Sequence, residues 1–145
     1  MFEEFEKYVY DNVEKDVPLN SDILDDYYLE LNKKYFGKDM VVDEEIKYEW
    51  ERIPHFYYDF YVYKYATGLS SSSYIVDSIL KNKKDAVKNY KEFLKKGCSM
   101  PPNEELKITG VDLTKEKTYK TAIKMFSDLV DLYEKTYEEY KRSGE

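Results

Sequence analysis

The sequence predicts an all-α protein, a compact domain of about six helices. Three observations indicate this fold class. Apolar residues recur every three or four positions over most of the chain, the period of a helix with one buried face. Asn, Ser or Asp precedes several of these stretches and Gly or Pro follows them, as expected at helix ends. Only residues 60–65 alternate like a strand, and no second strand pattern is available to pair with them.

Length and composition predict a single domain, residues 1–145. The chain is 42% hydrophobic and 37% charged, too apolar for a disordered chain. Its net charge of −7 argues against nucleic acid or an anionic membrane as a partner, because phosphate binding needs a basic surface. No apolar run is long enough to cross a bilayer, and the first residues lack a signal-peptide pattern. The single Cys98 excludes an internal disulfide and indicates a cytoplasmic, reducing compartment.

Three helices are predicted in the first half of the chain. The first covers residues 2–15, with an apolar face formed by Phe2, Phe5, Val9 and Val13. The second follows an N-cap at Asn20 to Asp22 and stops at Gly37. The third starts near residue 44, capped by Asp43, and should break near Ile53 because Pro54 cannot continue a helix.

Further helices are predicted in the second half of the chain. Residues 55–80 read as a buried helix, in which four consecutive serines, Ser70 to Ser73, can hydrogen bond back to the helix backbone. Residues 83–96 form the next helix, which ends at Gly97. Its inward face is expected to comprise Ala86, Val87, Tyr90, Phe93 and Leu94. A short helical turn runs from an Asn103 cap through Leu106. The last helix begins at Thr114, and its inward face is expected to comprise Tyr119, Ala122, Ile123, Phe126, Leu129, Val130, Tyr133, Tyr137 and Tyr140.

The residues that could carry chemistry gather around His55. Most of the 17 tyrosines are expected at the edge of the core, with the ring buried and the hydroxyl in water. His55 is the only histidine and stands beside four tyrosines. Tyrosine hydroxyls and an imidazole can donate hydrogen bonds to an oxygen that gains negative charge. The alternative interpretation is a buried histidine with a purely structural hydrogen bond.

The sequence offers little for a metal. One His and one Cys cannot assemble a conventional His/Cys zinc site. The acidic clusters at residues 25–26 and 43–45 lack the ligand spacing of a calcium loop and are expected to be solvated. Cys98 follows a helix-ending glycine without a basic neighbour in sequence that would activate it as a nucleophile.

One string of residues resembles a known family. Residues 48–68, YEWERIPHFYYDFYVYKYATG, are similar to the C-terminal signature of oligoendopeptidase F, a zinc metallopeptidase related to thimet oligopeptidase. The similarity continues in FLKKGCS at residues 93–99 and GVDLT at residues 110–114. It also includes Pro18-Leu19, residues 28–32 and residues 41–45.

The resemblance implies a helical C-terminal part of a larger peptidase that hydrolyses short peptides. In that family a His-Glu-x-x-His motif and a downstream Glu hold the zinc, and the Glu within the motif is the general base. These elements lie upstream of the residues matched here. The resemblance therefore implies zinc in the complete enzyme, none bound by this chain alone, and no activity until the zinc-bearing upstream part is supplied.

By motif position, the resemblance implies catalytic roles for His55, Tyr58 and Tyr63, which would stabilise the tetrahedral oxyanion. On a helix starting near Pro54, His55 and Tyr58 would share a face and Tyr65 would lie near it, whereas Tyr63 would need a rotation or kink. Tyr57 or Tyr61 could take the place of Tyr58. The residues implied in substrate binding are Arg52, Tyr57, Tyr61, Tyr65 and Gly68.

Two other functions are open from the sequence. The first is a free-standing, non-catalytic helical interaction module that binds through an exposed aromatic face. The second, an independent enzyme with His55 as its acid–base group, lacks an evident nucleophile. Exposed Tyr57, Phe60 and Tyr61 would favour self-association, so a dimer or higher oligomer is expected.

Overall fold

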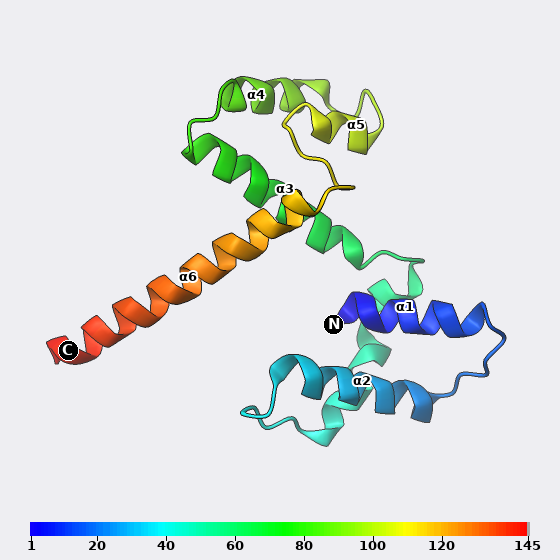
Figure 1. Cartoon of the computed structure of the whole chain (residues 1–145). Helices are drawn as coiled ribbons and strands as arrows, with labels where there is room; N and C mark the ends of the chain where they lie inside the picture. The colour runs from blue at the N-terminus through cyan, green and yellow to red at the C-terminus, as the bar shows by residue number, and fades with distance from the viewer. Residues whose placement is uncertain (145) are drawn as a thin grey trace. The chain divides into compact units, whose positions relative to one another are not determined.

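The computed structural model describes residues 1–144, and over that range the chain forms six α-helices, two 3-10 helices and no strand (Figure 1). The prediction of an all-α fold is confirmed. The chain divides into two compact units, one of residues 1–64 and one that starts at Tyr65. That all 145 residues form one domain of a larger peptidase stays a prediction. No helix of the described part is both long and apolar enough to cross a membrane.

The first unit contains α1 (Phe2–Val13), α2 (Ser21–Phe36), η1 (Glu44–Arg52) and η2 (Pro54–Tyr57). The predicted N-cap of α2 is confirmed, because the Asn20 side chain accepts a hydrogen bond of 2.9 Å from the Ile23 amide. Gly37 ends α2 with a φ of 76°, a left-handed conformation that a side chain would strain.

The core of the first unit is aromatic. Phe5 and Tyr28 are almost fully buried and meet edge to face, with their ring centroids 5.1 Å apart. Leu31 completes the buried cluster, and the half-buried side chains packed on it are Met1, Phe2, Val9, Leu24, Tyr27, Trp50 and Phe56. Val13 was predicted on the buried face of α1 but is exposed, since it is the last residue of that helix.

The third predicted helix is present, but residues 44–52 form a 3-10 helix. Two adjacent side chains anchor it to α2: Trp50 Nε1 donates to Asp25 Oδ1 at 2.8 Å, and Glu49 Oε2 accepts from the Tyr28 hydroxyl at 2.8 Å. Over so short a segment these tertiary bonds outweigh the small intrinsic preference for the α form. The predicted break at Ile53 is confirmed, with an extended residue before Pro54.

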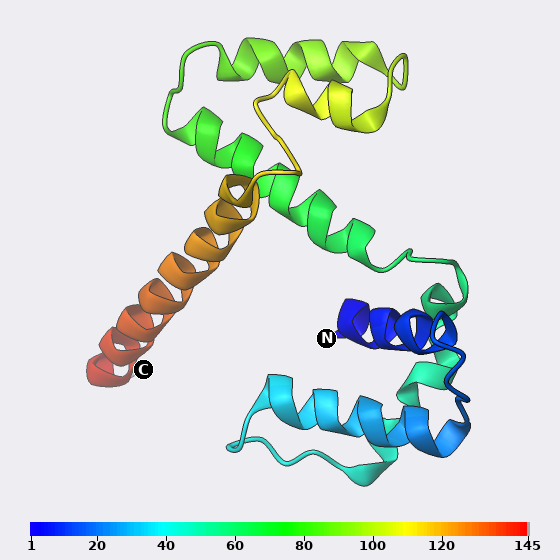
Figure 2. The ribbon, with the colours of Figure 1, turned by 45° about the vertical axis from the view of Figure 1, so that its right-hand side comes forward.

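The second unit contains most of α3 (Tyr63–Leu80), then α4 (Ala86–Lys96), α5 (Pro102–Lys107) and α6 (Glu116–Ser143). α4 and α5 lie side by side (Figure 2). A small core forms where Tyr74 and Ile75 of α3 meet Val111 from the loop before α6. Gly97 ends α4 as predicted, with a left-handed φ of 49°. The cap of α5 is Pro101 and not Asn103, which lies inside the helix.

Predicted burial is wrong for much of the second unit. The serines of α3 behave as expected, and Ser71 donates to the Thr67 carbonyl at 2.7 Å. However, Leu69, Val76 and Leu80 of α3 are exposed, as are Val87 and Leu94 of α4. Most of the apolar face of α6 is exposed too, in particular Ile123, Phe126, Leu129, Val130, Tyr133, Tyr137 and Tyr140. Helical period was predicted correctly, but the described residues do not cover these faces.

Candidate functional site

The aromatic segment around His55 is not one helix. His55 lies in η2, α3 begins only at Tyr63, and the residues between them form an irregular turn. Asp59 and Phe60 adopt successive left-handed φ values of 47° and 52°. Such a pair is unfavourable for residues other than glycine, so the contacts around the turn must hold it. The expectation of a single helical face shared by His55, Tyr58 and Tyr65 is therefore wrong.

Three of the predicted residues nevertheless meet in the first unit. The His55 ring centroid lies 5.4 Å from that of Tyr61 and 6.4 Å from that of Tyr58. The two tyrosine rings are 6.0 Å apart and nearly perpendicular. The turn, and not helical spacing, brings these rings together, because η2 ends at Tyr57 and α3 begins only at Tyr63. We call His55, Tyr58 and Tyr61 the three-ring cluster.

Several side chains of this segment are exposed. Tyr58 and Tyr57 are 59% and 62% exposed, and His55 and Tyr61 are half-buried. The Tyr57 hydroxyl donates to the Glu51 carbonyl over 3.4 Å, a long bond that leaves it free to exchange partners. The Lys64 ammonium lies 4.4 Å from the Tyr61 ring centroid and adds positive charge to one side of the cluster. The segment thus presents a partly exposed aromatic surface that carries tyrosine hydroxyls.

Tyr63 lies outside the three-ring cluster. It is the first residue of α3, and 44% of it is exposed. In the second unit, Tyr65 is also exposed, and Gly68 sits on an open face of α3 where an added Cβ would meet nothing within 4 Å. The backbone therefore does not require glycine at position 68.

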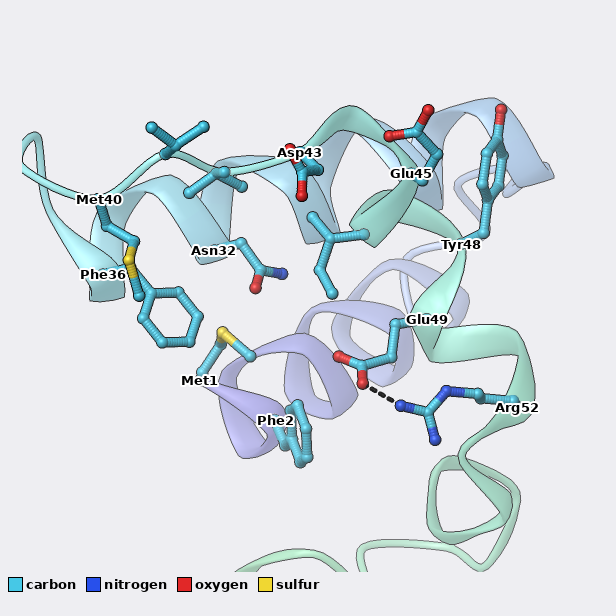
Figure 3. A pocket seen from close by; sticks show the side chains of 13 residues that line it. Met1, Phe2, Asn32, Phe36, Met40, Asp43, Glu45, Tyr48, Glu49 and Arg52 are labelled. Atoms are coloured by element: carbon cyan, nitrogen blue, oxygen red, sulfur yellow. Dashed lines mark hydrogen bonds and ion pairs between the residues drawn. The ribbon is translucent and has the colours of Figure 1, made fainter.

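Arg52 sits on the rim of a pocket of about 790 Å³ in the first unit (Figure 3). Its guanidinium pairs with Glu49, whose second oxygen accepts the Tyr28 hydroxyl. Burial first, and then the bond to Glu49, raise the pKa of Tyr28 well above its usual value, so Tyr28 remains a hydrogen-bond donor. The Tyr28–Glu49–Arg52 chain orients one guanidinium edge and leaves most of Arg52 in solvent.

Two supporting residues of α1 escaped the sequence analysis. The buried Glu6 carboxylate accepts the amides of Tyr61 and Val62, and the Tyr10 ring stacks on Phe60 with centroids 4.3 Å apart. A signal for Glu6 existed. It is the acidic residue one position after Phe5, four after Phe2, and thus beside the apolar stripe of its helix.

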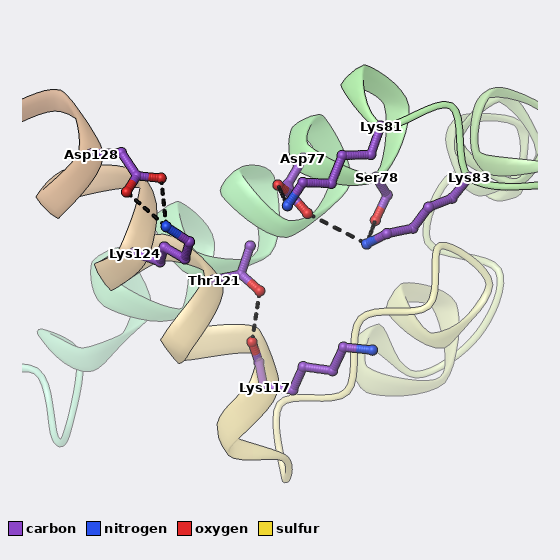
Figure 4. A network of polar contacts seen from close by, with 8 residues as sticks. All are labelled: Asp77, Ser78, Lys81, Lys83, Lys117, Thr121, Lys124 and Asp128. Atoms are coloured by element: carbon purple, nitrogen blue, oxygen red, sulfur yellow. Dashed lines mark hydrogen bonds and ion pairs between the residues drawn. The ribbon is translucent and has the colours of Figure 1, made fainter. Parts of the chain in front are cut away.

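The polar network of the second unit in Figure 4 is self-contained. Asp77 pairs with Lys81 at 2.6 Å and Lys83 at 3.4 Å, and Lys124 pairs with Asp128 of the same helix at 2.7 Å. The lysine bonds lower the pKa of Asp77. Each carboxylate is thus paired with lysines near it in the sequence.

Within residues 1–144, no group of three or more His, Cys, Asp or Glu side chains could hold a metal ion.

Comparison with known proteins shows the family of the chain. A family profile described as peptidase family M3 matches residues 1–125. Oligopeptidase PepF of Bacillus subtilis is 46% identical over 99% of this chain, which spans 21% of that protein. An oligoendopeptidase F homolog of Borreliella burgdorferi is 44% identical over 95% of the chain and 23% of its own length.

Two solved peptidase structures are also similar to the chain. The crystal structure of oligoendopeptidase-F from Enterococcus faecium superposes with a TM-score of 0.91 at 42% identity, covering 95% of this chain and 26% of that one. A putative peptidase from Chlamydophila abortus gives a TM-score of 0.76 at 36% identity, covering 86% of this chain and 21% of that one. The chain thus spans about a fifth to a quarter of the length of these relatives.

Proposed function

The chain belongs to peptidase family M3, and from that premise we propose that it is the C-terminal, substrate-binding part of an oligoendopeptidase F-like enzyme that hydrolyses short peptides. His55, Tyr58 and Tyr63 donate hydrogen bonds to the carbonyl oxygen as it becomes a tetrahedral oxyanion. Tyr57, Tyr61, Tyr65, Arg52 and Gly68 line the bound peptide. The zinc of the complete enzyme is held outside these residues, so the chain alone is inactive.

The three-ring cluster supports this proposal most directly. It places the only imidazole of the chain against two tyrosine rings beside exposed hydroxyls. A peptide carbonyl laid along this surface would meet several donors, and donors held in place before the reaction stabilise developing charge without reorganisation. Arg52, held by Glu49, supplies a cation for an acidic group of the peptide.

The test combines the chain with the zinc-bearing upstream part, as one polypeptide or as two, and measures hydrolysis of a quenched fluorescent peptide. We expect activity only in the combination. His55→Ala, Tyr58→Phe and Tyr63→Phe should each lower kcat by about 100- to 1,000-fold with little change in KM, the usual cost of one oxyanion donor.

Tyr35→Phe is the matched control, because Tyr35 belongs to α2 and its hydroxyl donates to Glu4 at 2.8 Å. It should retain wild-type turnover. Tyr61→Phe decides between the two tyrosines of the cluster: the larger loss of kcat identifies the oxyanion donor. A combination that binds zinc but does not hydrolyse peptides would favour the alternative, a non-catalytic interaction module. Unchanged turnover in all three site variants would refute the assigned roles.

We propose in addition that the isolated chain self-associates in the cytoplasm. Tyr57 and Phe60 are exposed together, and so is most of the apolar face of α6. Burying such surface between copies is favourable. Light scattering over a wide range of concentrations tests this, and a constant monomer mass would rule it out.

A further inference from the structure

The turn that carries the three-ring cluster does not hold itself together. Asp59 and Phe60 both adopt left-handed backbone conformations, with φ values of 47° and 52°, and neither is glycine. A free chain would leave such a conformation readily. Some contact outside the turn must therefore select it, since the rings of Tyr58 and Tyr61 face His55 only while the turn persists.

Glu6 of α1 makes that contact. Its side chain is almost completely buried, at 1% exposure. Oε1 accepts the Tyr61 amide at 3.2 Å and Oε2 accepts the Val62 amide at 3.3 Å. A buried carboxylate that binds two successive backbone amides holds the chain strongly, because removing it would leave both donors without a partner.

Tyr10, which follows Glu6 by one turn of α1, contacts the same irregular turn. Its ring stacks on Phe60 at an angle of 28° with centroids 4.3 Å apart. Glu6 and Tyr10 are four residues apart, so they project from one face of α1. The polar contact holds the amides after the turn, and the aromatic contact holds the side chain within it.

We infer that Glu6 is a positioning residue, whose two backbone bonds keep Tyr58 and Tyr61 against His55. The inference rests on the proposed function, because it assigns Glu6 to the same site. Tyr10 assists by holding Phe60. Glu6 does not touch the substrate in this account. Glu6 affects the positions of the Tyr58 and Tyr61 side chains. Misplacing a catalytic group by about 1 Å can lower the rate by up to about 100-fold.

The bonds themselves are tested first in the 145-residue chain by amide hydrogen exchange. Glu6→Leu should raise the exchange rates of Tyr61 and Val62 at least about 10-fold, and Glu6→Gln, which keeps one acceptor oxygen, should raise them less. Amides in the middle of α2 report the global stability of the first unit, and the rise at residues 61 and 62 should exceed any rise there. Unaltered exchange at residues 61 and 62 in both variants would overturn the inference, whatever the outcome for catalysis.

The catalytic consequence is tested in the combination with the zinc-bearing part. Glu6→Gln should lower kcat about 10-fold or more while KM changes less than about twofold, and Glu6→Leu should lower it further. Glu4→Gln is the matched control: Glu4 lies on the same helix but pairs with Lys34 at 2.6 Å. It should leave kcat unchanged. Equal kcat in Glu6→Gln and wild type would overturn the positioning role.

These outcomes separate the inference from the proposed function. If His55→Ala retains full turnover, the proposed function fails, even where the exchange at Tyr61 and Val62 responds to Glu6. If His55→Ala loses turnover and Glu6→Gln does not, only the positioning role fails.

Discussion

The two units of the chain bury their apolar residues to very different extents. In the first unit, Phe5, Tyr28 and Leu31 are nearly inaccessible and are surrounded by half-buried neighbours from α1, α2, η1 and η2. In the second, the buried cluster is small, and most of the apolar face of α6 is exposed. The difference teaches that amphipathic spacing predicts which face of a helix is apolar, but not what covers it.

Buried polar groups are paired in both units, and in the second unit the Thr118 hydroxyl donates to the Asp112 carbonyl at 2.9 Å. Buried polar side chains of the first unit bond to other elements or to their own helix: Asp25 accepts Trp50 Nε1, and Asn32 donates to the Tyr28 carbonyl at 2.9 Å. In the second unit the ion pairs on α6, such as Lys124–Asp128, link residues one helical turn apart at the surface. Surface pairs of this kind add little stability, so the second unit depends more on its small core.

Two phenylalanine variants should show the largest difference in stability between a buried and an exposed apolar site. Phe5→Ala should lower the free energy of unfolding of the first unit by about 3–5 kcal/mol, because it opens a cavity in the buried cluster. Phe126→Ala, at a site 69% exposed, should change the stability of the monomer by less than about 0.5 kcal/mol at concentrations too low for self-association. Urea unfolding checks the first through Trp50, the only tryptophan, and the second through helical circular dichroism. Comparable losses in both variants would mean that α6 is covered in solution.

The small core of the second unit gives the next largest effect. Val111 is fully buried against Tyr74 and Ile75, and Val111→Ala should cost about 2 kcal/mol. We expect the urea midpoint followed by circular dichroism to fall more than the midpoint followed by Trp50, which lies in the first unit. Val87→Ala on the exposed side of α4 is the control. Equal shifts of both probes would show that the units unfold together.

The smallest expected effect is a pH dependence at Glu3. Burial, and then the charge of Glu6, raise the pKa of Glu3 above its ordinary value of 4.5, with a bond to the Tyr63 backbone opposing them. The folded state therefore keeps a proton that the unfolded chain has lost. This contribution to stability is present below pH 4.5 and is lost as the pH rises through the raised value.

Glu3→Gln removes that dependence, so its stability relative to wild type should increase from about pH 4.5 upward, as measured by Trp50 urea midpoints. Glu4→Gln is the contrast, because the bond from Lys34 lowers the pKa of Glu4, and its contribution is lost as the pH falls. Parallel curves for Glu3→Gln and wild type would contradict the prediction.

Sequence reasoning located most helices but not the site. Asn20, Gly37, Pro54 and Gly97 act within a few residues of themselves, so the ends they determine can be predicted locally. The meeting of His55 with Tyr61 could not, since it depends on two left-handed residues and on a carboxylate 55 residues earlier in the chain. The family resemblance identified the aromatic segment around His55, whereas the assumption of a single helix predicted the arrangement of its side chains wrongly.

The sequence by itself determined the all-α class, the boundaries of the main helices and the aromatic segment that relates this chain to oligoendopeptidase F. These follow from backbone propensities, caps and residue identity, all of which are local. Only the tertiary structure decided that residues 44–52 adopt 3-10 form, that Glu6 holds the turn, and which apolar faces are buried. The physical reason is that burial and long-range hydrogen bonds depend on which surfaces meet, and amphipathic spacing does not contain that information.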